Sequence, residues 1–163
     1  MKRIVIIGNS GSGKSTLAKE LGTTRALQVV HLDKLFWAEG SYSEKRPPAI
    51  VRAELDRRKA EPEWIMEGVF GELAELLLDR ADYLIWLDLP WSVCRSGLEQ
   101  RGPSRNDEPA QALFANLILW AENYWTRTDL RSAAGHAEIF RRFTGEKAHI
   151  TQRDALKPLL RTG

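Results

Sequence analysis

The stretch Gly8–Ser15, with the sequence GNSGSGKS, decides the fold of this chain, because it fits the pattern G-x-x-x-x-G-K-[ST] of a phosphate-binding loop, or P-loop. The apolar run before it, IVII at 4–7, predicts a buried strand. Residues 15–22 after it place Leu17 and Leu21 four positions apart and end in glycine, which predicts a helix. The strand, the glycine-rich turn and the helix follow one another in the order that this motif requires.

The residue types in the loop suit the phosphates of a nucleotide. Its glycines allow positive φ angles and bring backbone N–H groups close to an anion, and the start of the next helix adds further N–H donors. We expect the Lys14 ammonium to reach the β- and γ-phosphates and the Ser15 hydroxyl to bind Mg²⁺. The alternative is a glycine- and serine-rich turn that binds nothing. The predicted contacts to ATP are Gly8, Ser10, Gly11, Ser12, Gly13, Lys14, Ser15 and Thr16.

Length and composition predict a single globular domain over 1–163. Apolar residues make up 43 % and charged residues 28 %, and 24 basic residues are interspersed with 22 acidic ones for a net charge of +2. This pattern does not support a nucleic-acid partner. The lone Cys94 excludes an internal disulfide and fits a reducing compartment, where we expect it to be packed and inert. Without a signal-peptide pattern or an apolar run of about 18 residues, the expected location is the cytoplasm, away from membranes.

Strand-like and helix-like stretches alternate along the rest of the chain. Strands are predicted over 28–33, 64–67, 83–88 and up to 149–150, helices over 50–60, 70–80, 91–101, 108–126, 129–143 and 152–161, and a loop over 34–47. The long helix 108–126 places Leu113, Leu117, Trp120 and Tyr124 on one face. Alternation of this kind predicts a parallel sheet covered on both faces, with ligands beyond the carboxyl ends of its strands.

Three carboxylates are therefore of interest, because each ends a predicted strand. Asp33 could accept the proton of an acceptor hydroxyl or orient that hydroxyl, although it could also cap the next helix or be solvated. Glu67 and Asp88 each follow an apolar strand, which is the pattern of a carboxylate that holds Mg²⁺. Only one of these two can play that role.

Phosphoryl transfer also needs positive charge beyond one lysine and a metal ion. Arg101 and Arg105 flank a Gly-Pro-Ser break and are predicted to lie on a mobile connection that could close over the reacting groups. Arg95 and Arg127 lie in or beside the same region, and solvated arginines are the alternative for each. Trp37 could stack on a nucleobase or on the ring of an acceptor.

Several of these motifs resemble the adenylate-kinase-like small P-loop proteins, and most closely those called topology-modulation (FlaR-like) proteins. The matching stretches are GNSGSGKST at 8–16, HLDKLFW at 31–37, WIMEG at 64–68, ADYLIWLDLP at 81–90, Arg101, and RND at 105–107. The resemblance covers most of residues 3–128. It implies a three-layer α-β-α fold with a five-stranded parallel sheet, the P-loop strand central, and a short helical lid over about 102–128. It also favours Glu67, followed by Gly68, as the metal ligand.

The chain departs from that family pattern at identifiable places. Gly97 stands where an arginine is usual, Trp91 stands where arginine is frequent, and Glu67 replaces the commoner aspartate. The adenylate kinases proper carry Thr-Gly-Asp near the end of the second strand, where this chain has His31-Leu32-Asp33. It therefore does not match an adenylate kinase.

The hypothesis that the sequence favours is an ATP- and Mg²⁺-dependent phosphotransferase acting on a small, unidentified acceptor. Lys14, Asp33, Arg101 and Arg105 would be catalytic, Ser15 and Glu67 would hold Mg²⁺, and 34–62 would contact the acceptor. The alternatives are a nucleotide-binding regulatory module and a slow NTPase without an acceptor.

Overall fold

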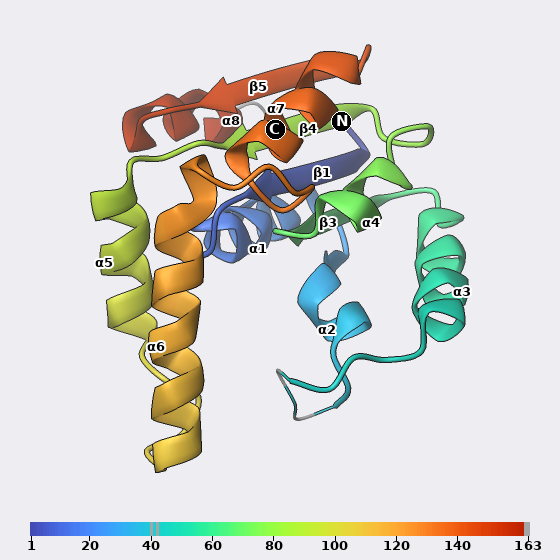
Figure 1. The fold of residues 1–163 in the computed structure, drawn as a ribbon. Helices are drawn as coiled ribbons and strands as arrows, with labels where there is room; N and C mark the ends of the chain where they lie inside the picture. The colour runs from blue at the N-terminus through green and yellow to red at the C-terminus, as the bar shows by residue number, and fades with distance from the viewer. Residues whose placement is uncertain (40, 42, 162–163) are drawn as a thin grey trace.

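Parallel strands form one sheet of five strands in the order β2-β3-β1-β4-β5 (Figure 1). The computed structural model describes residues 1–39, 41 and 43–161, so Gly40 of the predicted loop lies outside the described residues. The strands are β1 (Arg3–Gly8), β2 (Val29–His31), β3 (Trp64–Gly68), β4 (Tyr83–Leu87) and β5 (Glu146–Ile150). The predicted five-stranded parallel sheet with a central P-loop strand is confirmed.

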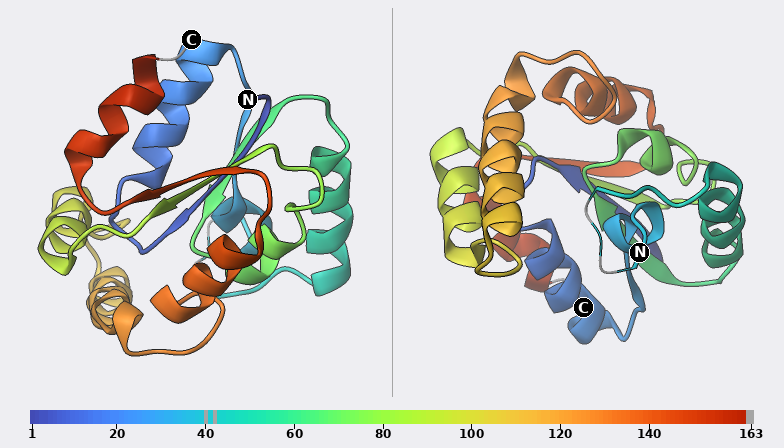
Figure 2. Two further views of the ribbon diagram at one scale, coloured as in Figure 1. Left: turned by 90° about the horizontal axis from the view of Figure 1, so that it is seen from above. Right: turned by 60° about the horizontal axis from the view of Figure 1, so that its bottom comes forward.

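Helices cover both faces of this sheet, which gives three layers (Figure 2). Alternate residues of β1 point to opposite faces: Ile4 and Ile6 pack with α1, α5 and α8, and Val5 and Ile7 pack with α2, α3, α4 and α7. The helices are α1 (Lys14–Arg25), α2 (Leu32–Phe36), α3 (Pro48–Lys59), α4 (Gly71–Glu75), α5 (Trp91–Arg101), α6 (Glu108–Glu122), α7 (Ala133–Arg142) and α8 (Lys157–Arg161), with short 3₁₀ turns η1 (Asn123–Trp125) and η2 (Arg153–Leu156).

The second predicted strand is shorter than expected. We predicted a strand over 28–33, but β2 ends at His31, and Asp33 lies in the first turn of α2. His31, Leu32 and Asp33 alternate polar and apolar as a strand would. Leu32 and Leu35, however, are both buried and three residues apart, which is the spacing of one helix face. The chain therefore turns into a helix as it leaves the sheet, and the predicted loop 34–47 begins inside α2.

Helix bounds differ from the prediction at several other places. The helix predicted over 70–80 ends at Glu75 and continues as turns, and the helix predicted over 129–143 starts at Ala133, where the Ser132 hydroxyl accepts a hydrogen bond from Gly135 N and caps it. The segment predicted as 108–126 is split into α6 and η1, and 152–161 into η2 and α8.

The apolar stripe of α6 is less buried than its pattern suggested. Tyr124, just beyond α6, is fully buried, but Leu113 is 46 % exposed. The reason is that α5 and α6 lie side by side and project from the sheet, so only the sheet-proximal end of the stripe reaches the core (Figure 1). In the part of the chain that the structure describes, no helix combines the length and apolar character needed to cross a membrane.

A chain of buried hydrogen bonds crosses the core on the α7 side. Trp86 Nε1 donates to the Tyr124 hydroxyl at 3.1 Å, that hydroxyl lies 2.6 Å from His136 Nδ1, and His136 Nε2 lies 3.0 Å from the Val69 carbonyl oxygen. Every group is satisfied if His136 is neutral with its proton on Nε2, so that Nδ1 accepts from Tyr124. Burial lowers the pKa of His136 to about 3, which agrees with this neutral form.

We expect His136 to make the free energy of unfolding depend on pH. Below its usual pKa of 6.5 the unfolded chain binds a proton there that the folded chain does not, so the stabilisation is complete above pH 6.5 and is lost as the pH falls toward 3. The slope is about 1.4 kcal/mol per pH unit. Urea unfolding at pH 7.5, 6.5, 5.5 and 4.5 measures it. His136→Gln, whose amide can both accept and donate, should remove this part of the slope; equal slopes for the two proteins would contradict the assignment.

Candidate functional site

The P-loop closes around its own lysine. The loop leaves β1 at Gly8 and enters α1 at Lys14, and Asn9 O accepts hydrogen bonds from Lys14 Nζ at 2.8 Å and from Ser12 N at 3.3 Å. Lys14 is only 8 % exposed. Burial lowers the pKa of Lys14, and the nearby carboxylates of Glu67 and Asp33 oppose that effect. The loop thus holds the ammonium group of Lys14 largely shielded from solvent at the start of α1.

One side-chain contact fixes the loop from the side, and one side chain of the loop lacks a partner. Asn9 Nδ2 donates to the Ala121 carbonyl oxygen at 2.8 Å, which joins the loop to the end of α6. The Ser12 hydroxyl is buried, and it has no hydrogen-bond partner among the described residues. An orphaned hydroxyl beside a buried ammonium at a helix start suits a phosphate oxygen as its missing partner.

Backbone packing against α5 explains one departure from the family pattern. A Cβ atom on Gly97 would lie 2.3 Å from Gly11 O, and one on Gly11, whose φ is +78°, would lie 2.0 Å from Cys94 O. The P-loop and α5 therefore meet backbone to backbone, with no room for a side chain. An arginine at 97 could not be accommodated in this packing. Cys94 is buried at this contact, as expected, and burial raises the pKa of its thiol to about 11.

The Gly97→Ala substitution should therefore destabilise the fold and disturb the loop. Overpacking of this kind costs about 1–3 kcal/mol, which exceeds the gain of up to about 1 kcal/mol from alanine's helix propensity. Thermal unfolding and a nucleotide titration measure the two effects. Ser96→Ala, on an exposed position of the same helix, is the matched control and should change neither. A Gly97→Ala protein as stable as the wild type would show that the backbones at Gly97 and Gly11 can move apart at little cost in free energy.

Next to the loop, a side chain from each of β2 and β3 meets Ser15 of α1. His31 and Glu67 are paired in register across the two strands. Glu67 Oε1 accepts a hydrogen bond from Ser15 Oγ at 2.9 Å and lies 2.6 Å from His31 Nδ1. Burial would raise the pKa of Glu67, but the hydrogen bond from His31, the charge of Lys14 and the hydrogen bond from Ser15 outweigh it and lower that pKa. The hydrogen bond to Glu67 correspondingly raises the pKa of His31.

The predicted metal ligands, Ser15 and Glu67, are thus in direct contact. A hydroxyl and a carboxylate are hard oxygen donors of the kind that Mg²⁺ prefers, and Mg²⁺ usually takes only one or two protein ligands beside phosphate oxygens and water. Within the described residues, no group of three or more His, Cys, Asp or Glu side chains could hold a metal by itself. The donor set therefore fits an ion that arrives with a nucleotide better than a resident metal.

Asp33 lies at the same edge, in the first turn of α2. Its side chain is exposed to solvent but crowded by protein, and this partial desolvation raises the pKa of the Asp33 carboxyl, with Lys14 opposing the shift and Glu67 adding to it. Arg101, the last residue of α5, is close enough for its charge to act on both Lys14 and Asp33. The structure thus brings Lys14, Asp33 and Glu67 to one edge of the sheet, and the charge of Arg101 acts on Lys14 and Asp33 from the end of α5.

A hollow of about 770 Å³ opens beside this cluster. Its rim is a hairpin that follows α2, closed by hydrogen bonds from Ala38 N to Glu44 O at 2.8 Å and from Arg46 N to Phe36 O at 2.9 Å. The sequence predicted only a loop over 34–47 here. It did not single out His31 as a site residue, since the local pattern does not say which strands will be neighbours. Side chains that line the hollow include Ser15, His31, Asp33, Trp37, Arg46 and Glu67.

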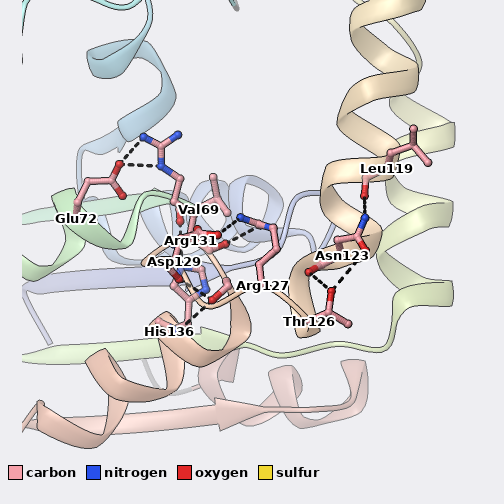
Figure 3. A network of polar contacts seen from close by, with 11 residues as sticks. Val69, Glu72, Leu119, Asn123, Thr126, Arg127, Asp129, Arg131 and His136 are labelled. Atoms are coloured by element: carbon pink, nitrogen blue, oxygen red, sulfur yellow. Dashed lines mark hydrogen bonds and ion pairs between the residues drawn. The ribbon is translucent and has the colours of Figure 1, made fainter.

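The connection between α6 and α7 braces the far side of α2 (Figure 3). Arg127 donates to Asp129 Oδ2 at 2.5 Å, and Arg131 Nε donates to Glu72 Oε1 at 2.7 Å. The Arg131 guanidinium also lies 4.6 Å from the ring centre of Phe36 in α2. Both arginines are engaged in holding this connection, and α2, which carries Asp33, is anchored through Phe36.

Other predicted site residues lie elsewhere. The Arg105 side chain is 70 % exposed and pairs with Asp107 at 2.8 Å, just before α6. Arg95 pairs with Glu99 along α5. Asp88 accepts a hydrogen bond from Trp125 Nε1 at 3.2 Å and lies 3.0 Å from His149 Nε2, so it ties β4, β5 and the end of η1 together. Glu67, not Asp88, is the strand-end carboxylate in contact with Ser15.

Several solved structures that are similar to this chain over nearly its whole length are named as kinases. The sequence matches no protein-family model and no curated protein. A shikimate kinase from Acinetobacter baumannii in complex with shikimate is similar over 98 % of this chain and 91 % of its own, with a TM-score of 0.55 and 13 % identity. A gluconokinase from Sinorhizobium meliloti 1021 covers 94 % and 85 %, with a TM-score of 0.54 and 16 % identity.

A deoxyadenosine kinase from M. mycoides with bound dATP is also similar, over 97 % of this chain and 96 % of that one, with a TM-score of 0.51 and 12 % identity. At these identities the likeness concerns the fold. The chain has the three-layer α/β fold of the small P-loop kinases.

Proposed function

We propose that this protein is an ATP- and Mg²⁺-dependent phosphotransferase that moves the γ-phosphate to a small acceptor. The observation that carries the proposal is the meeting of Lys14, Asp33 and the Ser15–Glu67 pair at one sheet edge, beside a hollow large enough for a small molecule. Kinases of shikimate, gluconate and deoxyadenosine share the fold, which supports the reaction type but not any one acceptor.

In this proposal Asp33, Lys14 and Arg101 have separate roles in phosphate transfer. The acceptor hydroxyl oxygen attacks the γ-phosphorus, the new O–P bond forms as the bond to the β,γ-bridging oxygen breaks, and ADP leaves. Asp33 accepts the hydroxyl proton or orients the hydroxyl for in-line attack. Lys14 and the loop N–H groups hold the β- and γ-phosphates, and Arg101 adds positive charge to the transferring group.

Mg²⁺ bound by Ser15 and Glu67 would neutralise charge on the β- and γ-phosphate oxygens. We further propose that residues 34–62, which include the hairpin rim, form the acceptor side, and that residues of about 102–128 close over the site as a lid carrying Arg101 and Arg105 at its base. Trp37, which lines the hollow, is in place to stack on a ring of the acceptor. The proposed subtype, a topology-modulation (FlaR-like) protein, rests on the sequence motifs.

Transfer of labelled γ-phosphate from ATP to a panel of nucleosides, nucleoside monophosphates, sugars and hydroxy acids tests the proposal. A labelled product that requires Mg²⁺ and is absent with Lys14→Met would establish a kinase and name its acceptor class. Tight ATP binding with no labelled product would favour the regulatory module, and phosphate release without an acceptor would favour the NTPase. A DNA affinity that falls with salt and changes with ATP would point to regulation of a nucleic-acid partner.

A further inference from the structure

Only one of the two carboxylate oxygens of Glu67 accepts hydrogen bonds from the described residues. Among the described residues, the Ser15 hydroxyl and the His31 imidazole both engage Oε1, at 2.9 Å and 2.6 Å. Glu67 is only 5 % exposed, yet it is one of the residues that line the hollow. One oxygen is therefore held by two neighbours, whereas Oε2 accepts no hydrogen bond from the described residues and is left for a ligand.

His31 is well placed to fix that orientation. Its backbone is set by the β2–β3 register opposite Glu67, and the next residue, Leu32, is completely buried and anchors the start of α2. Because the imidazole is short and branches from a strand, it has far fewer positions to choose from than a surface lysine or arginine. To donate to a carboxylate, Nδ1 must carry a proton.

Ser15 alone would hold Glu67 less firmly. Its hydroxyl has a single proton, which goes to Oε1, so its lone pairs stay free for a cation. A single hydrogen bond still lets the carboxylate rotate about the bond to its chain. Two donors on the same oxygen, from α1 and from β2, remove that freedom.

We propose that His31 is a positioning residue that holds the Glu67 carboxylate so that Oε2 faces the metal ion brought by the nucleotide. This inference rests on the proposed metal role of Ser15 and Glu67. Groups that orient a metal-binding side chain in this way typically contribute 10–100-fold to metal affinity. The effect should be confined to the metal, since His31 has no hydrogen bond to the P-loop glycines among the described contacts.

Calorimetric titration with an ATP analogue whose γ-phosphate cannot be transferred tests this inference without measuring turnover. Titrations run with increasing Mg²⁺, and in EDTA. For His31→Leu we expect about 10–100-fold weaker Mg²⁺ binding to the protein–nucleotide complex, with the affinity in EDTA unchanged. His31→Asn, whose amide nitrogen can occupy nearly the place of Nδ1, should recover most of the loss. Equal weakening with and without Mg²⁺, or no weakening, would overturn the proposal.

A second comparison separates a positioning role from a general structural one. If His31 acts through Glu67, then His31→Leu should have no further effect on Mg²⁺ affinity in a Glu67→Gln background. Additive losses would overturn the proposal. Loss of Mg²⁺ affinity in His31→Leu with no phosphorylated acceptor in any panel would leave this inference standing and sink the proposed function. Full transfer activity with unchanged Mg²⁺ affinity in His31→Leu would overturn this inference and leave the proposed function standing.

Discussion

Lys14→Met should reduce phosphate transfer by at least about 10²–10³-fold, the usual cost of removing one preorganised group that faces developing charge. The ammonium of Lys14 lies almost buried at the start of α1, where water screens its field poorly, so in the proposed reaction it would act strongly on the phosphates. Methionine has a similar length and no charge, so it fills the same space. Nucleotide titration and labelled transfer, with and without Mg²⁺, measure the loss.

Fold stability should change little in this variant, because two effects oppose each other. Asn9 O loses the hydrogen bond from Lys14 Nζ, but a cation with a lowered pKa is no longer buried. Lys19→Met, an exposed lysine on the same helix, is the matched control and should transfer phosphate like the wild type. Wild-type nucleotide affinity in Lys14→Met would mean that the loop does not bind the triphosphate.

The sheet and the P-loop were accessible from sequence because their signals are local. A β-branched apolar run followed by Gly8–Ser15 and a leucine-spaced helix contains the whole strand–loop–helix unit within about twenty residues. The local pattern of an acid that ends an apolar strand indicated both Glu67 and Asp88, and it was the family resemblance that favoured Glu67. Such features depend on neighbours in the chain, and the structure has them where the sequence placed them.

Features that depend on distant pairings could not be predicted. The contact between His31 and Glu67 joins residues separated by α2, the hairpin and α3, and it exists because β2 and β3 are neighbours in this register. Gly97 stands where the family usually has an arginine. The cause is the Gly11 carbonyl oxygen of the P-loop, which packs against this position and leaves no room for a side chain. The exposure of Leu113 likewise follows from the projection of α5 and α6, which no amphipathic pattern encodes.

Asp33 is the predicted site residue whose structural setting differs most from the prediction. As the end of a strand it would have pointed along the sheet, but in the first turn of α2 it lies on the wall of the hollow, near the charges of Lys14 and Arg101. Helix α2 is itself anchored by Phe36 against Arg131, so the carboxylate is carried on a braced element. A fixed carboxylate with a raised pKa is a stronger base, when ionised, than a free aspartate.

We therefore expect Asp33→Asn to lower acceptor-dependent transfer by about 10²–10⁴-fold, the range for a general base, while nucleotide affinity stays close to that of the wild type. Asparagine keeps the size and can still accept a hydrogen bond, but it cannot take the proton. Glu20→Gln is the control, since Glu20 is an exposed carboxylate on α1 that is not among the residues lining the hollow. It should leave the rate of transfer nearly unchanged.

The dependence of the rate on pH separates proton transfer from simple binding. Transfer needs the ionised form of Asp33, so the wild-type rate should fall as the pH drops through a pKa above the usual 3.8 of aspartate. Asp33→Asn should lose this acidic limb while keeping any limb that other groups cause. If Asp33→Asn and wild type transfer phosphate at the same rate with the same pH profile, Asp33 takes no part in the reaction. The acceptor hydroxyl would then have to be activated from elsewhere on the hollow's wall.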